Sequence, residues 1–344
     1  MTTDMNTAQI STAPLVSVVV IGRNEGERLR RCLQSVFEMD RCGFEVEVIY
    51  ADSGSIDGSV ELAQSMGART IVLHPERPSA ALGRNAGWRA AKGSIVLFLD
   101  GDTILHPRFV TDSLHEFSDP EIAVVWGHRR ELYPDRSIYI RTLDLDWIYA
   151  PGRTPYCGGD ALFLRDVLAR VNGFDETLIA GEEPELCRRI AALGFAILHV
   201  DRPMTGHDLA IHRWAQYWKR STRAGHAFAE VADRFRSTGQ QFWTEESKAN
   251  RNRAVALVGL LLLGLVGSIF WLSPWPLAAV LAFFTLLAIR SSWKVRWKTK
   301  DVLALALYGV HSHMQQVPIY IGQLQYKLNR RRGKRAMLVE YKQL

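Results

Sequence analysis

Two acidic side chains, Asp100 and Asp102, follow directly on a short apolar run at residues 95–99. An apolar run of this length without a polar face predicts a central strand that is covered on both sides, as in an α/β sheet. Ligands bind such sheets at the carboxyl ends of the strands. Two carboxylates this close repel each other unless a cation or a donor neutralises them, and Mg²⁺ or Mn²⁺ prefers oxygen ligands. Because Asp-Gly-Asp also favours turns, the triplet alone leaves a metal site and a turn open.

Acidic residues also follow two earlier predicted strands, at 16–22 and 46–51, where Glu25 and Asp52 stand near the strand ends. Helical segments alternate with these strands, which predicts right-handed βαβ units and a parallel sheet. Carboxylates at this edge could accept hydrogen bonds from a ribose or a base, or hold a cation that carries phosphates. The chain has neither a Walker lysine loop nor GxGxxG after its first strand. We therefore expect a nucleotide diphosphate bound through cation and sugar contacts, and no dinucleotide.

Further candidates follow in the second half of the chain. The Gly-Gly-Asp triplet at 158–160 allows close approach of a ligand to the backbone, although a plain turn explains it equally well. Glu182 and Glu183 precede Pro184, which suits the first turn of a helix, and acids at that end favour the helix dipole. More acidic residues lie in this segment than are needed to cap one helix. His207 follows a late predicted strand and is a candidate ligand, although most single histidines are ordinary surface or core residues.

The distribution of charge excludes a nucleic-acid partner as the reason for the basic character. Residues 251–344 carry a balance of +12, whereas residues 1–250 carry −6. The basic excess therefore flanks the most apolar part of the chain, which suits an anionic membrane surface. The four cysteines form no CxxC pair, which favours reduced thiols in a cytosolic domain. Residues 1–14 are polar and lack the apolar core of a signal peptide.

The C-terminal third predicts a membrane anchor. Residues 254–289 form a run of 36 without a charge, which as one helix would measure about 54 Å against a hydrocarbon core of ~30 Å. Pro274 and Pro276 divide it into spans at about 254–272 and 274–290, with Trp271 at an interface. Basic residues flank both ends, so both ends are expected to face the cytoplasm.

The remaining apolar segment, 301–328, contains polar residues such as His311 and His313 and ends in a cluster of arginines. A full span would place that cluster outside, against the positive-inside tendency, so an interfacial or re-entrant helix is favoured over a third membrane helix. The expected organisation is a flexible N-terminus at 1–14, an α/β domain at 15–235, a linker at 236–253, a transmembrane hairpin at 254–290, the segment 301–328, and a basic cytoplasmic tail at 329–344.

Six motifs in order make the chain similar to one known family. The chain resembles the family 2 inverting glycosyltransferases, which have the GT-A fold, a mixed and mostly parallel sheet. The resemblance covers roughly residues 15–230 and implies a nucleotide-sugar donor and a divalent metal, Mg²⁺ or Mn²⁺. The motifs that carry it lie at residues 18–25, 52–58, 83–87, 100–102, 158–160 and 181–186.

By position, the resemblance also implies roles for individual residues. Glu183 matches the catalytic base beside Glu182, although family members usually carry Glu-Asp here. The remaining roles are contacts to the donor nucleotide by Glu25, Asp52, Arg84 and Asp100; metal ligands Asp100, Asp102 and His207; and acceptor-side residues Gly158, Gly159, Asp160, Arg213 and Trp214. Processive members carry Gln-x-x-Arg-Trp, but Ala210 stands at the Gln position. This difference weakens the interpretation of the chain as a synthase that threads its polymer through the membrane.

The expected function is inverting transfer of a hexose-type sugar from a nucleotide-diphosphate sugar to a lipid-linked or envelope glycan acceptor. Such a transfer passes through an oxocarbenium-like state and needs a cation for the leaving diphosphate and a base for the acceptor hydroxyl. We expect the enzyme at the plasma (inner) membrane with a cytoplasmic catalytic domain, in cell-envelope polysaccharide synthesis. The alternatives are a polyprenyl-phosphate glycosyltransferase, whose acceptor is a phosphate, and an inactive membrane protein that binds nucleotide sugars. A nucleotidyltransferase is disfavoured because no basic phosphate loop follows the first strand.

Overall fold

The computed structural model describes residues 13–334 of the chain. Within this range, nine strands form one mixed sheet in the order β3-β2-β1-β4-β8-β6-β9-β5, with β7 paired to β9. The strands are β1 (Leu15–Gly22), β2 (Glu45–Asp52), β3 (Arg69–Val72), β4 (Ile95–Asp100), β5 (Thr103–Leu105), β6 (Ile122–Glu131), β7 (Gly152–Thr154), β8 (Ala161–Leu164) and β9 (Ala196–His207).

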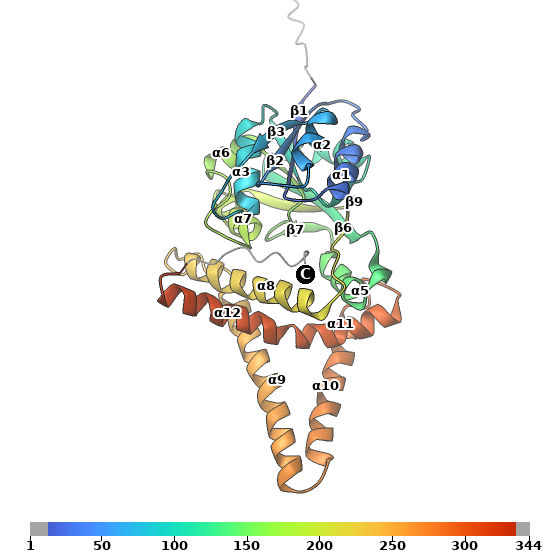
Figure 1. Cartoon of the computed structure of the whole chain (residues 1–344), viewed down its shortest axis with the longest axis vertical. Helices are drawn as coiled ribbons and strands as arrows, with labels where there is room; N and C mark the ends of the chain where they lie inside the picture. Colours follow the sequence, from blue (N-terminus) through green and yellow to red (C-terminus); the bar gives the residue numbers. More distant parts are fainter. Residues whose placement is uncertain (1–12, 335–344) are drawn as a thin grey trace, which may run out of the picture.

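Helices cover the sheet and extend the chain beyond it (Figure 1). The α-helices are α1 (Glu27–Phe37), α2 (Ser59–Ser65), α3 (Ala80–Ala90), α4 (Phe109–Ser113), α5 (Ile138–Asp144), α6 (Arg165–Arg170), α7 (Glu182–Ala192), α8 (Trp214–Phe235), α9 (Thr244–Phe270), α10 (Trp275–Lys294), α11 (Val302–Met314) and α12 (Gln316–Arg331). Short 3₁₀ helices are η1 (Leu114–Ser118), η2 (Pro134–Arg136) and η3 (Leu145–Trp147).

The first half of the sheet is parallel, as the alternation of strands and helices predicts. β3, β2, β1 and β4 run in one direction, and β6 runs parallel to β9, whereas β8 is antiparallel to both β4 and β6. The apolar run that precedes Asp100 is buried at every residue from Ile95 to Leu99. Burial of both faces explains why this strand shows no polar alternation. The expected central strand is therefore confirmed.

A layer of helices lies between the α/β domain and a helical hairpin. In Figure 1, α8, α11 and α12 run across the base of the sheet domain, and α9 and α10 project away from it. Helices α8 and α12 approach closely at two glycines. A Cβ at Gly225 would lie 1.9 Å from the carbonyl oxygen of Ile319, and one at Gly322 would lie 1.9 Å from that of Thr222. Only residues without a side chain permit this contact, so the two glycines fix the packing of the layer.

Helices α9 and α10 are each long and apolar enough to cross a membrane. Their apolar side chains are largely exposed, including Leu263 and Phe270 of α9. Helix α9 begins at Thr244, so residues 244–253, which were expected to be linker, form its first turns. The segment expected at 301–328 consists of two helices, α11 and α12, in the layer of Figure 1. The expectations for residues 1–12 and 335–344 lie outside the described residues.

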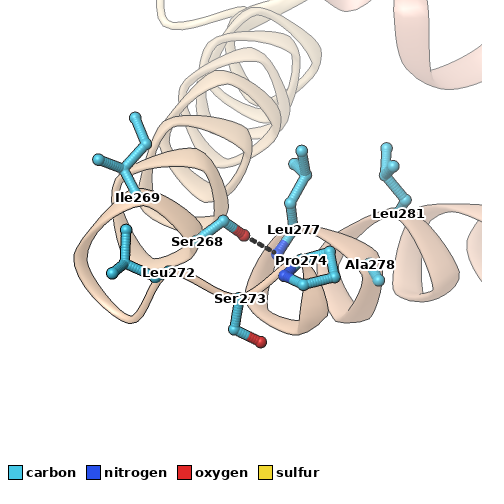
Figure 2. Close-up of a pocket in the computed structure, with 8 residues that line it drawn as sticks. All are labelled: Ser268, Ile269, Leu272, Ser273, Pro274, Leu277, Ala278 and Leu281. Atoms are coloured by element: carbon cyan, nitrogen blue, oxygen red, sulfur yellow. Dashed lines mark hydrogen bonds between the residues drawn. The ribbon is translucent and has the colours of Figure 1, made fainter.

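Figure 2 shows a pocket at the far end of the hairpin, with a volume of about 520 Å³. Its lining comes from the end of α9, the connecting turn and the start of α10, and includes Ile269, Leu272 and Leu281. The hydroxyl of Ser268 accepts a hydrogen bond from the backbone N–H of Leu277 at 3.0 Å and joins the two helices there. The pocket contains none of the acidic residues singled out in the sequence.

Candidate active site

The parallel strands bring Asp52 and Asp100 to one edge of the sheet, where both stand opposite the end of β1. Asp100 ends β4, and its backbone N–H donates to Oδ1 of Asp160 at 3.0 Å. Asp160 is buried, and its Oδ2 accepts from the hydroxyl of Thr205 on β9 at 2.8 Å. The antiparallel part of the sheet thus holds the end of β4 in place.

Arg84 of α3 connects three carboxylates and is 2% exposed. Its Nη2 lies 2.9 Å from Oδ1 of Asp100, and its Nη1 lies 3.0 Å from Oε1 of both Glu182 and Glu183. Burial alone would lower the pKa of Arg84, but Glu183, then Asp100 and Glu182, raise it above its usual value. Because a buried charge without partners is strongly unfavourable, this guanidinium depends on the carboxylates around it. We call Arg84, Asp100, Glu182 and Glu183 the carboxylate cluster.

The pKa values of two carboxylates that contact Arg84 are shifted in opposite directions. Burial, followed by the charge of Glu182, raises the pKa of Glu183 to about 7. Burial would also raise the pKa of Asp100, but Arg84 and Arg129 together hold it below its usual value. Environments that push neighbouring carboxylates apart in pKa are a signature of acid–base sites. Glu183 can therefore exchange a proton near neutral pH, while Asp100 stays ionised.

The glycine pair before β8 touches this cluster at one position. A Cβ at Gly159 would lie 2.7 Å from Nη2 of Arg84, 2.9 Å from Oδ2 of Asp100 and 3.3 Å from Oε1 of Glu183. A Cβ at Gly158 would meet nothing within 4 Å. The backbone at Gly159 therefore packs against the charged groups, and a side chain there would displace them.

A buried histidine links the other acid of the Asp-Gly-Asp turn to β6. Nε2 of His207 lies 3.3 Å from Oδ2 of Asp102, and its Nδ1 lies 2.7 Å from Oε1 of Glu131. Oε2 of Glu131 accepts from the backbone N–H of Leu209 at 3.1 Å. A carboxylate on Nδ1 is the usual arrangement that orients a histidine whose Nε2 is a metal ligand.

The site carries more negative than positive charge. Arg84 and Arg129 face the carboxylates of Asp100, Asp102, Asp160, Glu131, Glu182 and Glu183. The oxygen and imidazole donors of Asp102 and His207 suit Mg²⁺ or Mn²⁺, and the excess charge would be offset by a divalent cation. In residues 13–334, no group of three or more His, Cys, Asp or Glu is arranged as a complete metal site. The protein itself thus brings together a pair of potential ligands.

Asp52 has a different environment from Asp100, although both end a strand. It is fully buried, and its Oδ1 accepts from the backbone N–H groups of Gly54 and Ser55 at 2.8 and 2.7 Å. Its Oδ2 accepts from the hydroxyls of Tyr50 and Ser55. These hydrogen bonds shape the loop after β2. The donor contact that the sequence led us to expect for Asp52 stays a prediction.

Glu25 lies beside the Asp100–Asp102 turn. A Cβ at Gly101 would lie 3.3 Å from its Cγ, and its carboxylate pairs with Arg28 at 2.8 Å. The expected acceptor-side residues are divided in the structure. Gly159 touches the carboxylate cluster, whereas Asp160 is buried and accepts from the backbone N–H of Asp100. The acceptor-side roles expected for these residues stay predictions.

Arg213 and Trp214 lie at the start of α8, in the helix layer. Arg213 is the N-cap of this helix, and Trp214 is 44% exposed and stacks on Tyr217 with ring centroids 5.2 Å apart. None of the contacts described for these two residues reaches the carboxylate cluster. Their expected role at the acceptor stays a prediction.

Three residues at the site were not anticipated. Arg129 lies 3.6 Å from carboxylate oxygens of both Asp100 and Asp160, Glu131 orients His207, and the Trp147 ring lies 4.6 Å from Cζ of Arg129. A signal was present in the sequence, because the apolar run of β6 continues directly into charged residues. The residues joined by these contacts are 18 or more positions apart in the chain, so the local sequence pattern does not reveal the contacts.

Comparison with known proteins identifies the sheet domain. Residues 17–169 match the model of glycosyl transferase family 2. The chain carries a family 2 glycosyltransferase domain. The family resemblance of the sequence motifs is thus confirmed, and so is a glycosyltransferase fold with apolar C-terminal helices.

Curated relatives share this domain. "Glycosyltransferase AglE" of Haloferax volcanii is 26% identical over 196 residues, which cover 54% of this chain and 64% of that protein. "Pre-mycofactocin glycosyltransferase" of Mycobacterium tuberculosis is 30% identical over 207 residues, which cover 56% of this chain and 42% of that protein. The chain therefore aligns with well under the full length of these relatives.

Solved structures confirm the GT-A fold. The mannosyltransferase PcManGT from Pyrobaculum calidifontis, solved with GDP-Man and Mn²⁺, superposes with a TM-score of 0.60 at 19% identity. The match covers 93% of this chain and 88% of that one, so it extends beyond the sheet domain. TarS residues 1–349 of S. aureus, solved with UDP-GlcNAc, gives a TM-score of 0.51 at 13% identity, covering 93% and 92% of the two chains.

Proposed function

We propose that this family 2 glycosyltransferase catalyses metal-dependent, inverting transfer of a hexose-type sugar from a nucleotide-diphosphate sugar to a lipid-linked or envelope glycan acceptor. The observation that carries the proposal is the carboxylate cluster, in which one buried guanidinium holds an ionised Asp100 and a Glu183 whose pKa is about 7. The ionised Asp100 suits the charged donor site, and Glu183 suits removal of the proton from the acceptor hydroxyl.

Glu183 is the proposed general base. The acceptor hydroxyl must lose its proton as it attacks the anomeric carbon, and a base with a pKa near the working pH serves best. A single displacement at that carbon inverts its configuration. Arg84 holds Glu183 and Glu182 by the same Nη1 atom, so Glu182 fixes the guanidinium that orients the base. A hydroxyl acceptor explains the need for this base better than a phosphate, which is already ionised.

Asp102 and His207 would hold the divalent cation, with Asp100 beside them. A bound cation stabilises the negative charge that develops on the leaving nucleoside diphosphate. The excess of carboxylates in the site is the support for this assignment, since a cation of charge two would offset it. PcManGT, which shares the fold, was solved with GDP-Man and Mn²⁺. Glu131 would keep Nε2 of His207 available by accepting from Nδ1.

The donor nucleotide is proposed to bind at the shared edge of β1, β2 and β4. Glu25 lies there beside the Asp100–Asp102 turn, and the loop that Asp52 organises follows β2. In this arrangement Asp52 acts through its loop, while Asp100 and Glu25 present carboxylates to the nucleoside. Arg84, which already binds three carboxylates, acts on the donor through Asp100.

We also propose that α9 and α10 anchor the enzyme in the plasma (inner) membrane, with the sheet domain in the cytoplasm. About 27 Å of helix separates Trp275 from Trp293 at 1.5 Å per residue, and both indoles are exposed. Tryptophan favours the two membrane–water interfaces, which lie ~30 Å apart across the hydrocarbon core. The helix layer would then lie along the cytoplasmic surface. We propose residues 15–235 as the catalytic domain, with the bounds that the sequence led us to expect.

The test is sugar transfer by full-length protein in detergent. The protein is incubated with a panel of radiolabelled nucleotide sugars, a bacterial lipid extract and Mn²⁺, and label in the lipid or glycan fraction is counted. We expect transfer with one donor, its loss with EDTA, and its loss in Glu183→Gln. The matched control is Glu121→Gln, which alters an exposed glutamate paired with Arg153. No transfer from any donor by folded protein would contradict the proposal and favour an inactive binding protein.

A further inference from the structure

The ring of Trp147 in η3 lies within cation–π distance of two guanidinium groups from different parts of the molecule. Cζ of Arg129 is 4.6 Å from the centre of its ring, and Cζ of Arg220 is 5.5 Å away. Arg129 faces Asp100 in the carboxylate cluster, whereas Arg220 belongs to α8 in the helix layer. The ring of His207 is also near, with centroids 5.9 Å apart. Trp147 therefore stands where the catalytic site meets the layer above the hairpin.

Two N–H donors at this position are buried without an acceptor. Neither Nε1 of Trp147 nor Nε of Arg129 has a hydrogen-bond partner in the part of the chain that the structure describes. Arg129 is 7% exposed, so its Nε is far from bulk water. Buried polar groups in native proteins are nearly always paired, and each exception calls for an explanation such as a bound ligand. Because both atoms are donors, the missing partner is an acceptor.

Cationic side chains from two other elements lie near η3. Burial would raise the pKa of Asp146, which precedes Trp147 in the chain, but His311, at 3.5 Å from its carboxylate, and then Arg220 and Lys298 hold it below its usual value. Nζ of Lys298 donates to the carbonyl of Leu145 at 2.7 Å, so this lysine is held against η3. Two cations beside one carboxylate leave a net positive charge. Burial lowers the pKa of Lys298, and a bound anion would favour its protonated form.

We propose that Trp147, Arg220 and Lys298 bind the phosphate of a lipid-phosphate-linked acceptor. The inference rests on the proposed function and names the acceptor's chemical class. Arginine and an indole N–H are suited to phosphate oxygens, and Lys298 follows α10 directly, at the end of the proposed membrane span. In this proposal the lipid chain of the acceptor would extend toward the hairpin and its sugar toward Glu183.

The contacts define how the two ends of such an acceptor would be coordinated. Glu183 contacts Arg84, Arg84 contacts Asp100, Asp100 contacts Arg129, and Arg129 stacks on Trp147. The base and the proposed phosphate site are thus joined by a continuous series of side-chain contacts. Asp146 opposes an incoming phosphate by its charge, so its replacement by Asn is expected to strengthen phosphate binding.

The test measures binding of geranyl phosphate to the full-length protein in detergent by calorimetry, with geraniol, inorganic phosphate and GDP or UDP with Mn²⁺ as comparison probes. Trp147→Phe keeps an aromatic ring near the two guanidiniums and removes the Nε1 donor. Arg220→Gln removes one cation. The matched controls are Trp293→Phe and Arg236→Gln, which change exposed residues of the same kinds.

We expect geranyl phosphate to bind, with Kd raised about fivefold or more in Trp147→Phe and about tenfold or more in Arg220→Gln, as is usual for loss of one charge-assisted hydrogen bond. Geraniol should not bind, and the controls should match the natural protein. Unchanged Kd in both site variants would overturn the proposal. Equal binding of inorganic phosphate would overturn the lipid assignment, and weaker nucleotide binding in Trp147→Phe would assign the donors to the nucleotide diphosphate instead. If nucleotide binds but geranyl phosphate does not, the acceptor inference fails while the proposed transferase activity stands.

Discussion

Asp52 and Asp100 end two parallel strands that flank β1 in the same sheet, yet their environments are opposite in kind. The hydrogen bonds described for the Asp52 carboxylate come from its own strand and the loop that follows, and the side chain is fully buried. Asp100 is 29% exposed in its side chain and faces two guanidiniums from α3 and β6. One acid builds a loop, and the other takes part in a charged site that is open to a ligand.

The difference shows that an acidic residue at a strand end has no fixed role. A carboxylate saturated by local N–H and O–H donors is a structural element of the turn. A carboxylate that shares long-range cations with other carboxylates remains available to a cation or a substrate. We therefore expect Asp100, whose charge is not balanced by local donors, to be the functional acid of the two.

The largest expected effect is that of Glu183→Gln. Removal of a general base typically lowers the rate 10²–10⁴-fold, so we expect kcat for sugar transfer to fall by that order with little change in donor affinity. Glutamine keeps the shape and can still accept from Arg84, so the protein should fold. The measurement is single-donor transfer with thermal unfolding as the folding control. Retention of more than a tenth of the wild-type kcat would exclude Glu183 as the base.

The comparison itself is tested by Asp100→Asn and Asp52→Asn. We expect Asp100→Asn to lower kcat/KM about 10²-fold in folded protein, because the variant loses a charge beside the cation and the diphosphate. Asp52→Asn disrupts hydrogen bonds of a loop and should cost about 1–2 kcal/mol of stability, with activity per folded molecule within about threefold. Transfer assays and chemical unfolding of both variants give the result. A larger loss of kcat/KM in Asp52→Asn than in Asp100→Asn would contradict the distinction between the two acids.

A smaller effect separates the two neighbouring glycines. Gly159→Ala places a methyl group against Arg84 and Asp100 and should lower kcat/KM about 10- to 100-fold, since misplaced catalytic groups are costly. Gly158→Ala meets open space and should change it less than about twofold. Equal effects of the two alanines on transfer would show that the close packing at Gly159 does not matter.

The last prediction concerns pH. Because the pKa of Glu183 is about 7, kcat/KM should rise about tenfold per unit below that pH and level off above it. The folded state binds this proton more tightly than the unfolded chain, so the associated stability is present at low pH and is lost as pH rises through 7. The loss amounts to about 3 kcal/mol, and Glu183→Gln should remove it. Activity that is flat from pH 5 to 8 in stable protein would contradict the assignment.

Much of the site was predictable because its residues follow strong local patterns. The apolar run before Asp100 and the acids before Pro184 mark a strand end and a helix start, and the order of the motifs identifies the family. The saturation of Asp52 was also partly local, since its partners lie within three residues. A sequence shows that such a turn is possible but does not show whether the carboxylate retains room for a ligand.

Other features depend on contacts between distant segments. Arg84 meets Glu182 and Glu183 across 98 residues or more, and His207 meets Glu131 across 76. The sheet order places β8 between β4 and β6, which brings Asp160 under Asp100 and Arg129 beside both. No periodicity along the chain encodes this order, so the support given by Asp160, Arg129 and Glu131 emerges only with the fold.

The most direct test of the central claim is thermal unfolding of detergent-solubilised protein with UDP, GDP and other nucleoside diphosphates, with and without Mn²⁺. Ligands that bind the folded state raise the melting temperature by mass action. We predict a shift of several degrees with one nucleotide, which requires Mn²⁺ and is lost in Asp102→Ala but retained in Glu121→Gln. The absence of a shift with every nucleotide, or a shift that persists unchanged in Asp102→Ala, would contradict a cation-dependent donor site at the end of β4.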